Sequence, residues 1–119
     1  MLLELKNVRQ VEKEGIRRWF SDEFFDLIVW FDYSHHIDGF QLCYDKDKNE
    51  RAITWMTDGS YRHDRIENGE TPYASKKTPI ILQDGVFNKQ KIAALFKKQA
   101  KSIDKKIANL VYHKILEYE

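Results

Sequence analysis

The sequence predicts a single α+β domain over residues 1–119: an antiparallel β-meander of four to six strands, followed by two C-terminal amphipathic helices packed on one face of the sheet. Residues 1–66 contain successive β-branched and aromatic runs joined by short polar links, whereas residues 88–118 repeat apolar residues at helical spacing. Strands first and helices afterwards are typical of a sheet whose helices are segregated to one face. A chain that is 42% hydrophobic can also bury a core.

Four strands are predicted by composition and by the connections between them, over residues 26–32, 39–44, 51–57 and 60–66. The dipeptide Asp58-Gly59 is typical of a two-residue hairpin turn, because glycine accepts a positive φ. Upstream, residues 3–11 and 16–20 fit a further hairpin, although Leu2, Leu5 and Val8 also fit a helical spacing. The sequence leaves both interpretations open.

Residues 67–87 are predicted to form a connection rich in glycine and proline, with residues 80–82 as a candidate edge strand. After it, Asn88 is expected to cap one helix, and Ser102 or Asp104 to open a second. The apolar positions that recur at helical spacing are Ile92, Leu95, Phe96, Ile103, Ile107, Leu110, Val111 and Tyr118.

Charge is unevenly distributed although the net charge is only +1. Residues 1–70 carry a net −5 and residues 71–119 a net +6, and all ten cations of the second part are lysines. The lone Cys43 excludes an intrachain disulfide and fits a reducing compartment. Glu4 and Lys6 interrupt the region where a signal peptide would be apolar, and no run approaches about 18 apolar residues. We therefore predict a cytoplasmic protein with no membrane partner.

Hairpin geometry predicts a first candidate site. If residues 58–59 form a two-residue turn, Thr54 lies opposite His63, and a four-residue loop in the preceding hairpin places Gln41 opposite Thr54. The row Gln41–Thr54–His63, with Tyr61 beside it, is a candidate site for a protein or small ligand, since such sites combine a few convergent polar groups with apolar surroundings. The alternative is that these side chains hydrogen-bond one another on a solvated face.

The same register predicts how the apolar side chains divide between the two faces. The face expected to seat the helices carries Phe40, Leu42, Ile53 and Trp55, joined by Ile28 and Trp30. The mixed face that holds the polar row also receives Cys43, Met56, Leu27, Val29 and Phe31.

The spacing of the candidate residues disfavours most catalytic and metal-binding interpretations. Cys43 and His63 would lie two strands apart, about 10 Å, whereas activation of a thiolate requires about 3 Å. His63 as a general base, with Arg65 on the same face, remains an alternative for a small enzyme. His35 and His36 lack the spacing of a metal site, and the nucleotide-binding and hydrolase motifs are absent from the sequence. No metal and no cofactor is predicted.

Lysines on the first helix form a second candidate surface. Lys97, Lys98 and Lys101 are predicted to lie opposite the apolar stripe, as a basic ridge that could follow phosphates in a nucleic-acid-associated protein. The helix lacks arginines for base contacts and exposed aromatic residues for stacking, so a solvated face is the alternative.

Four runs, RRWFSD, DLIVWFD, GFQLCYD and AITW, resemble a group of short bacterial proteins with no assigned activity. The similarity covers roughly the predicted meander. It implies a bacterial origin and carries over no catalytic residue, ligand or cofactor. The leading prediction is therefore a non-enzymatic binding or interaction module, with the nucleic-acid and enzyme hypotheses as alternatives.

Overall fold

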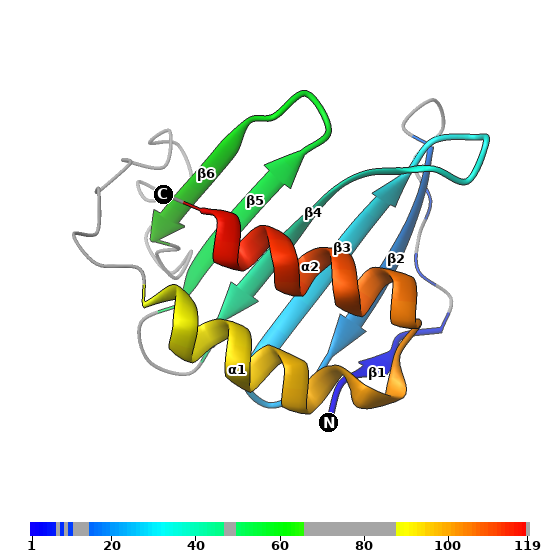
Figure 1. Cartoon of the computed structure of the whole chain (residues 1–119). Coiled ribbons are helices and arrows are strands. Elements are labelled where there is room, and N and C mark those ends of the chain that lie inside the picture. Colours follow the sequence, from blue (N-terminus) through cyan, green and yellow to red (C-terminus); the bar gives the residue numbers. More distant parts are fainter. Residues whose placement is uncertain (7, 9, 11–14, 47–49, 66–87, 119) are drawn as a thin grey trace, which may run out of the picture.

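The chain forms an antiparallel six-stranded sheet with two helices on one of its faces (Figure 1). This computed structural model describes residues 1–6, 8, 10, 15–46, 50–65 and 88–118. Strands follow one another across the sheet in chain order, which confirms the predicted meander with helices after it. The elements are β1 (Leu3–Glu4), β2 (Ile16–Ser21), β3 (Phe25–Phe31), β4 (Ile37–Tyr44), β5 (Arg51–Met56), β6 (Tyr61–Arg65), α1 (Lys89–Gln99), the 3₁₀ turn η1 (Ala100–Ser102) and α2 (Lys105–Glu117).

The four predicted strands correspond to β3, β4, β5 and β6. Upstream, β1 pairs antiparallel with β2 and Leu3 lies opposite Ser21, as the hairpin interpretation predicts and the helical one does not. The predicted strand at residues 3–11 is shorter, however, because among its described residues only Leu3 and Glu4 are in a strand. The candidate edge strand at residues 80–82 lies outside the described residues.

Both helices begin at a side-chain cap, as the sequence predicts. The Asn88 side chain accepts a hydrogen bond from the Lys91 amide at 3.2 Å, and Asp104 accepts one from the Lys106 amide at 2.9 Å. Of the two candidates for the second helix, Asp104 is therefore the cap. Ser102 instead donates a hydrogen bond to the Leu2 carbonyl.

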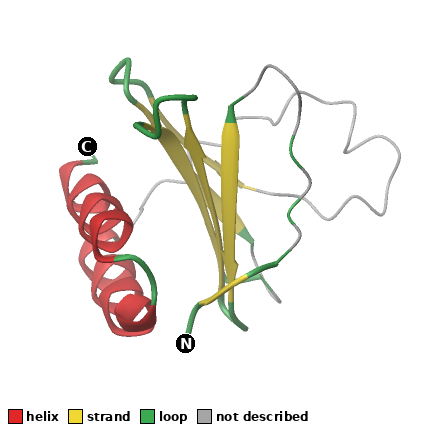
Figure 2. Ribbon diagram, turned by 90° about the vertical axis from the view of Figure 1, so that its right-hand side faces the viewer, coloured by secondary structure: helices red, strands yellow, loops and turns green. Residues whose placement is uncertain are grey.

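Both helices lie over the same face of the sheet (Figure 2), and apolar side chains from the helices and the sheet form one core between them. Alternation along each strand points one set of side chains at the helices. The fully buried large residues of this core include Phe20, Phe25, Leu27, Val29, Phe40, Leu42 and Ile53 from the sheet, and Phe96, Ile107, Val111 and Ile115 from the helices.

The side chains of β3 point to the opposite faces of the sheet from those predicted. Leu27 and Val29 are buried in the core, whereas Ile28 and Trp30, predicted to seat the helices, alternate onto the opposite face. The β3–β4 hairpin explains the difference, because its pairing is irregular between Trp30 and Phe31 and Val29 lies opposite Phe40. An irregularity of one residue exchanges the two faces of a strand.

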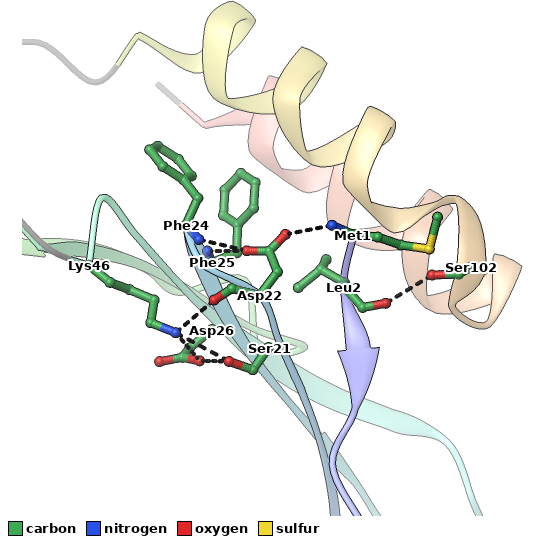
Figure 3. Close-up of polar contacts among 9 residues, drawn as sticks. All are labelled: Met1, Leu2, Ser21, Asp22, Phe24, Phe25, Asp26, Lys46 and Ser102. Carbon is green, nitrogen blue, oxygen red and sulfur yellow. Dashed lines mark hydrogen bonds and ion pairs between the residues drawn. The ribbon is translucent and has the colours of Figure 1, made fainter.

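The N-terminal residues are fixed between the sheet and the helix corner (Figure 3). Leu2 is fully buried, its amide donates to the Gln99 carbonyl at 2.9 Å, and its carbonyl accepts from the Ser102 hydroxyl at 2.8 Å. The Met1 ammonium lies 3.8 Å from an oxygen of the buried Asp22 side chain. These contacts join the first residues of the chain to the turn between the two helices.

Polar side chains also fix the β2–β3 turn (Figure 3). Asp22 accepts hydrogen bonds from the amides of Phe24 and Phe25 at 2.8 and 2.6 Å. Beyond the end of β4, the Lys46 ammonium donates to the Asp22 carbonyl at 2.8 Å and to Asp26 at 3.1 Å. A partly exposed ion pair of this kind contributes little by itself, so these contacts position the turn rather than supply much of the stability.

The burial of Leu2 leads to a prediction about stability. Leu2→Ala should lower the free energy of unfolding by about 2–5 kcal/mol, because it leaves a cavity in the core. Leu3→Ala is the matched control, since Leu3 is 64% exposed, and its effect should stay within about 0.5 kcal/mol. Urea denaturation followed by tryptophan fluorescence measures both, and equal effects would contradict the observed N-terminal packing.

Candidate functional site

The predicted polar row is correct across its first pair of strands and wrong across the second. Gln41 lies opposite Thr54 in the β4–β5 hairpin, as predicted. In the β5–β6 hairpin, however, Thr54 lies opposite Arg62, and His63 lies opposite Ile53. The row is therefore Gln41–Thr54–Arg62, and the predicted site loses His63.

A three-residue loop accounts for the shift of register. The Met56 amide donates to the Ser60 carbonyl at 3.1 Å, and the Gly59 amide donates to the Met56 carbonyl at 2.9 Å, so residues 57–59 form the loop. Gly59 has a φ of +92°, the conformation that ends such a loop. The dipeptide Asp58-Gly59 fits both two-residue and three-residue loops, and the sequence pattern alone does not distinguish them.

Burial energetics favour the observed register. In the predicted register, alternation would turn Arg62 and Asp64 toward the helices and bury two charged groups. In the observed register, His63 takes that position, and burying one hydrogen-bonded imidazole costs far less than burying two charged groups. Arg62 and Asp64 instead form an ion pair at 3.2 Å on the other face of the sheet.

His63 and Tyr61 belong to the layer between the sheet and α2. His63 is 7% exposed, and its Nε2 is hydrogen-bonded to the Tyr44 hydroxyl at 2.6 Å. The Tyr61 hydroxyl donates to the Lys114 carbonyl at 3.1 Å, and the Tyr61 ring contacts Tyr118. Both residues are thus separated by the sheet from Gln41 and Thr54.

The helix-free sheet face, as we call the face opposite the helices, combines polar and large apolar side chains. By strand alternation and pairing it carries Trp19, Ile28, Trp30, Gln41, Thr54, Met56 and Arg62. The Arg62 side chain is exposed, and the side chains of the other six residues are half-buried. Met56 packs over Gly39, and a Cβ atom added at Gly39 would lie only 2.4 Å from the Met56 sulfur. No described helix covers this face (Figure 2).

Two buried polar atoms on the helix-free sheet face have no hydrogen-bond partner in the described structure. They are the indole nitrogen of Trp19 and one carboxylate oxygen of Asp64. Such atoms are rare in folded proteins, and they distinguish this face from an ordinary solvated sheet surface.

The structure separates Cys43 from His63. Cys43 lies opposite Asp26 and Ala52 on the helix-free side, whereas His63 points toward the helices. Burial raises the pKa of the Cys43 thiol to about 12. A thiol of this kind is protonated at neutral pH and behaves as a small apolar side chain.

The histidines of the β3–β4 loop lie apart from any metal-ligating cluster. His36 is 3.6 Å from the Asp32 carboxylate, and its side chain is 80% exposed. A hydrogen bond from the His36 amide, and to a smaller extent one from the Ser34 amide, lowers the pKa of the Asp32 carboxyl. Among the described residues, no three His, Cys, Asp or Glu side chains are grouped as metal ligands would be.

The predicted lysine ridge is exposed on the outside of the helix layer. Lys97, Lys98 and Lys101 all point away from the core, and Lys105 and Lys106 at the start of α2 are also exposed. The ridge and the helix-free sheet face therefore lie on opposite sides of the molecule (Figure 2).

Sequence reasoning missed Trp19, Trp30 and Arg62 as neighbours of Gln41 and Thr54. The face of Trp30 depends on the irregular β3–β4 pairing, and Arg62 shares that face because the loop at residues 57–59 is one residue longer than the predicted turn. A signal was available for Arg62, since the two-residue turn would have required burying both Arg62 and Asp64.

The hydrogen bond between Tyr44 and His63 can be tested through stability. Tyr44→Phe should lower the free energy of unfolding by about 1–2 kcal/mol, because it removes one partner of a buried hydrogen bond without changing the ring. Tyr33→Phe serves as control, since Tyr33 is 66% exposed. If chemical denaturation gives the same midpoint for Tyr44→Phe and wild type, the contact contributes nothing to stability.

The raised pKa of Cys43 predicts its reactivity. At pH 8, alkylation of the native protein by iodoacetamide should be on the order of a thousandfold slower than alkylation of an unstructured cysteine, because the thiolate fraction is lower by that factor. The same protein in denaturing urea provides the reference rate. Fast native alkylation would show that Cys43 is an accessible thiolate and would reopen a nucleophilic role.

Comparisons of the chain with protein-family models, with curated proteins and with solved structures find no match. The resemblance to short bacterial proteins therefore stays a prediction. Among the described residues, neither helix combines the length and the apolar character that crossing a bilayer requires.

Proposed function

We propose that this chain is a non-enzymatic interaction module whose helix-free sheet face binds a protein partner. The observation that carries the proposal is the polar row Gln41–Thr54–Arg62 crossing three strands beside partly exposed tryptophans on a face that no described helix covers. The proposal keeps Gln41 and Thr54 from the sequence analysis. In place of Tyr61 and His63, the proposed site contains Trp19, Trp30 and Arg62, which lie on the same face as Gln41 and Thr54.

Residue composition supports a protein partner. Tryptophan, methionine and arginine are enriched at protein interfaces relative to the rest of the surface, and tryptophan and arginine dominate their binding energy. Trp30 and Arg17 lie opposite each other on adjacent strands of this face, and Trp19 is two residues from Arg17. Gln41 and Thr54 add hydrogen-bonding groups between these anchors and Arg62.

The shape of a sheet face also favours a macromolecule over a small ligand. Neighbouring strands are about 4.8 Å apart, so the row from Gln41 to Arg62 extends about 10 Å along a gently twisted surface. Small-molecule sites are usually concave and enclose most of the ligand. A broad surface of this kind instead suits the area of about 800 Å² that each partner contributes to a stable complex.

The enzyme alternative has less support. His63, its candidate base, is buried and hydrogen-bonded to Tyr44, and the candidate thiol Cys43 lies across the sheet from it. A general base must reach a substrate proton directly or through one water. Turnover lost in His63→Ala with the fold intact would be the observation that favours this alternative.

Site-specific crosslinking tests the proposed partner site. We expect a photoreactive amino acid at Thr54 to crosslink a defined cellular protein, whereas the same group at Asn109 on the outer face of α2 should not. The crosslinked protein is then purified and titrated by calorimetry. Trp30→Ala should weaken its binding at least tenfold, since anchors of this type contribute about 2 kcal/mol or more.

Two outcomes would contradict the proposed function. The first is crosslinking equally efficient from Thr54 and Asn109, and the second is unchanged affinity in Trp30→Ala and in Thr54→Arg. Sedimentation equilibrium of the purified chain adds a further test, because a second copy as partner would appear as concentration-dependent dimerisation abolished by Thr54→Arg. Circular dichroism establishes that each variant remains folded.

A further inference from the structure

The geometry points to a second binding surface: the outer face of the helix layer binds the phosphate backbone of duplex nucleic acid without reading its sequence. We call it the lysine surface, and it consists of the exposed lysines Lys91, Lys97, Lys98, Lys101, Lys105 and Lys106. It lies on the opposite side of the molecule from the proposed protein site, and its test is independent of that site (Figure 2).

The positive charge of the lysine surface is not neutralised within the described structure. Residues 88–118 contain eight lysines and two acids, Asp104 and Glu117. Asp104 pairs with Arg18 at 3.5 Å, and Glu117 pairs with Lys114 at 3.1 Å. Among the described residues no carboxylate lies within ion-pair distance of the six lysines. Both acids are thus engaged elsewhere, and the surface retains its charge.

Helix stability explains only part of where these lysines are placed, because Lys97 and Lys98 lie in the last turn of α1, where cations are favourable, whereas the lysines at the start of α2 do not. Neither α1 nor α2 has an acid in its first turn, and Lys105 and Lys106 occupy the first turn of α2. Cations at a helix N-terminus face the positive end of the macrodipole, which is unfavourable. A bound polyanion would turn this unfavourable placement into a favourable one.

The two helices present their lysines as one surface. They lie side by side (Figure 1), and the Lys97 ammonium reaches over the Tyr112 ring of α2, 5.3 Å from its centroid. From Lys91 to Lys98 the rise along α1 is about 10 Å, at about 1.5 Å per residue. This reach is close to the width of the major groove of duplex DNA, about 12 Å. The surface can therefore contact phosphates on both strands that border a groove.

The side chains of the lysine surface indicate which kind of polyanion it binds. The lysine surface has no arginine, so it lacks the bidentate contacts that identify a base. Tyr112 is half-buried beneath Lys97 and the exposed ring of α2 is the small imidazole of His113, so the two helices expose no Phe, Tyr or Trp ring on which the bases of a single strand could stack. The exposed residues of α1 and α2 are polar apart from Ala94, so the apolar side chains that anchor a helix in a lipid surface are lacking there.

Fluorescence anisotropy with a labelled mixed-sequence duplex of about 20 bp, titrated between about 50 and 200 mM NaCl, tests the proposal. We expect binding that weakens steeply with salt and does not change between duplex sequences. The triple variant Lys97→Gln, Lys98→Gln, Lys101→Gln should bind at least tenfold more weakly at about 100 mM NaCl, and its salt slope should be smaller by about 2–3. A triple variant with Lys→Arg at the same three positions keeps the charges and should bind the duplex about as tightly as the wild-type protein.

A single-charge comparison controls for net charge. Lys98→Gln should weaken binding, whereas Lys6→Gln, which makes the same charge change on an exposed residue near the N-terminus, should not. The proposal is overturned by absence of duplex binding at about 50 mM NaCl, by equal effects of these two variants, or by tighter binding to a single strand of the same length. Lysine-dependent binding to phosphatidylserine vesicles without duplex binding would overturn it in favour of a lipid surface.

Discussion

Burial of one sheet face beneath α1 and α2 decides where almost every other side chain of the sheet lies. Each large apolar side chain buried there contributes about 1.5–3 kcal/mol, whereas a typical hydrogen bond contributes about 0.5–1.5 kcal/mol. The apolar layer that includes Phe25, Phe40 and Phe96 therefore outweighs the polar contacts around it. Because side chains alternate along a strand, filling this layer sends the intervening residues, Trp30 and Thr54 among them, to the opposite face.

Polar contacts act within that constraint by fixing ends and registers. Asp22 closes the β2–β3 turn, and Leu2 and Ser102 join the first strand to the helix corner. Gly59 makes the larger difference, since one loop residue determines which face His63 and Arg62 occupy. The buried imidazole is accommodated because Tyr44 supplies a hydrogen-bond partner, whereas Arg62 retains solvent.

The charge asymmetry of the sequence becomes a spatial separation in the fold. The described acids of the first part lie in strands and turns, and some are paired with nearby cations such as Lys46 and Arg62. The six lysines of the lysine surface lie on the outside of the helix layer, away from those acids. The molecule thus presents two chemically different surfaces on opposite sides, and a partner on one would leave the other accessible.

The sequence was enough to predict the fold class, the four strands β3 to β6, the Asn88 cap of α1 and the pairing of Gln41 with Thr54. These features depend on local signals: alternation, helical periodicity, capping side chains and a short polar loop. The phase of β3 and the face of His63 depend on tertiary contacts, because an irregularity between Trp30 and Phe31 and one extra loop residue each reverse the faces of a strand. The strand register that forms is the one that buries suitable side chains beneath the helices. Those helices come last in the sequence, so local patterns within the strands do not reveal which register is favoured.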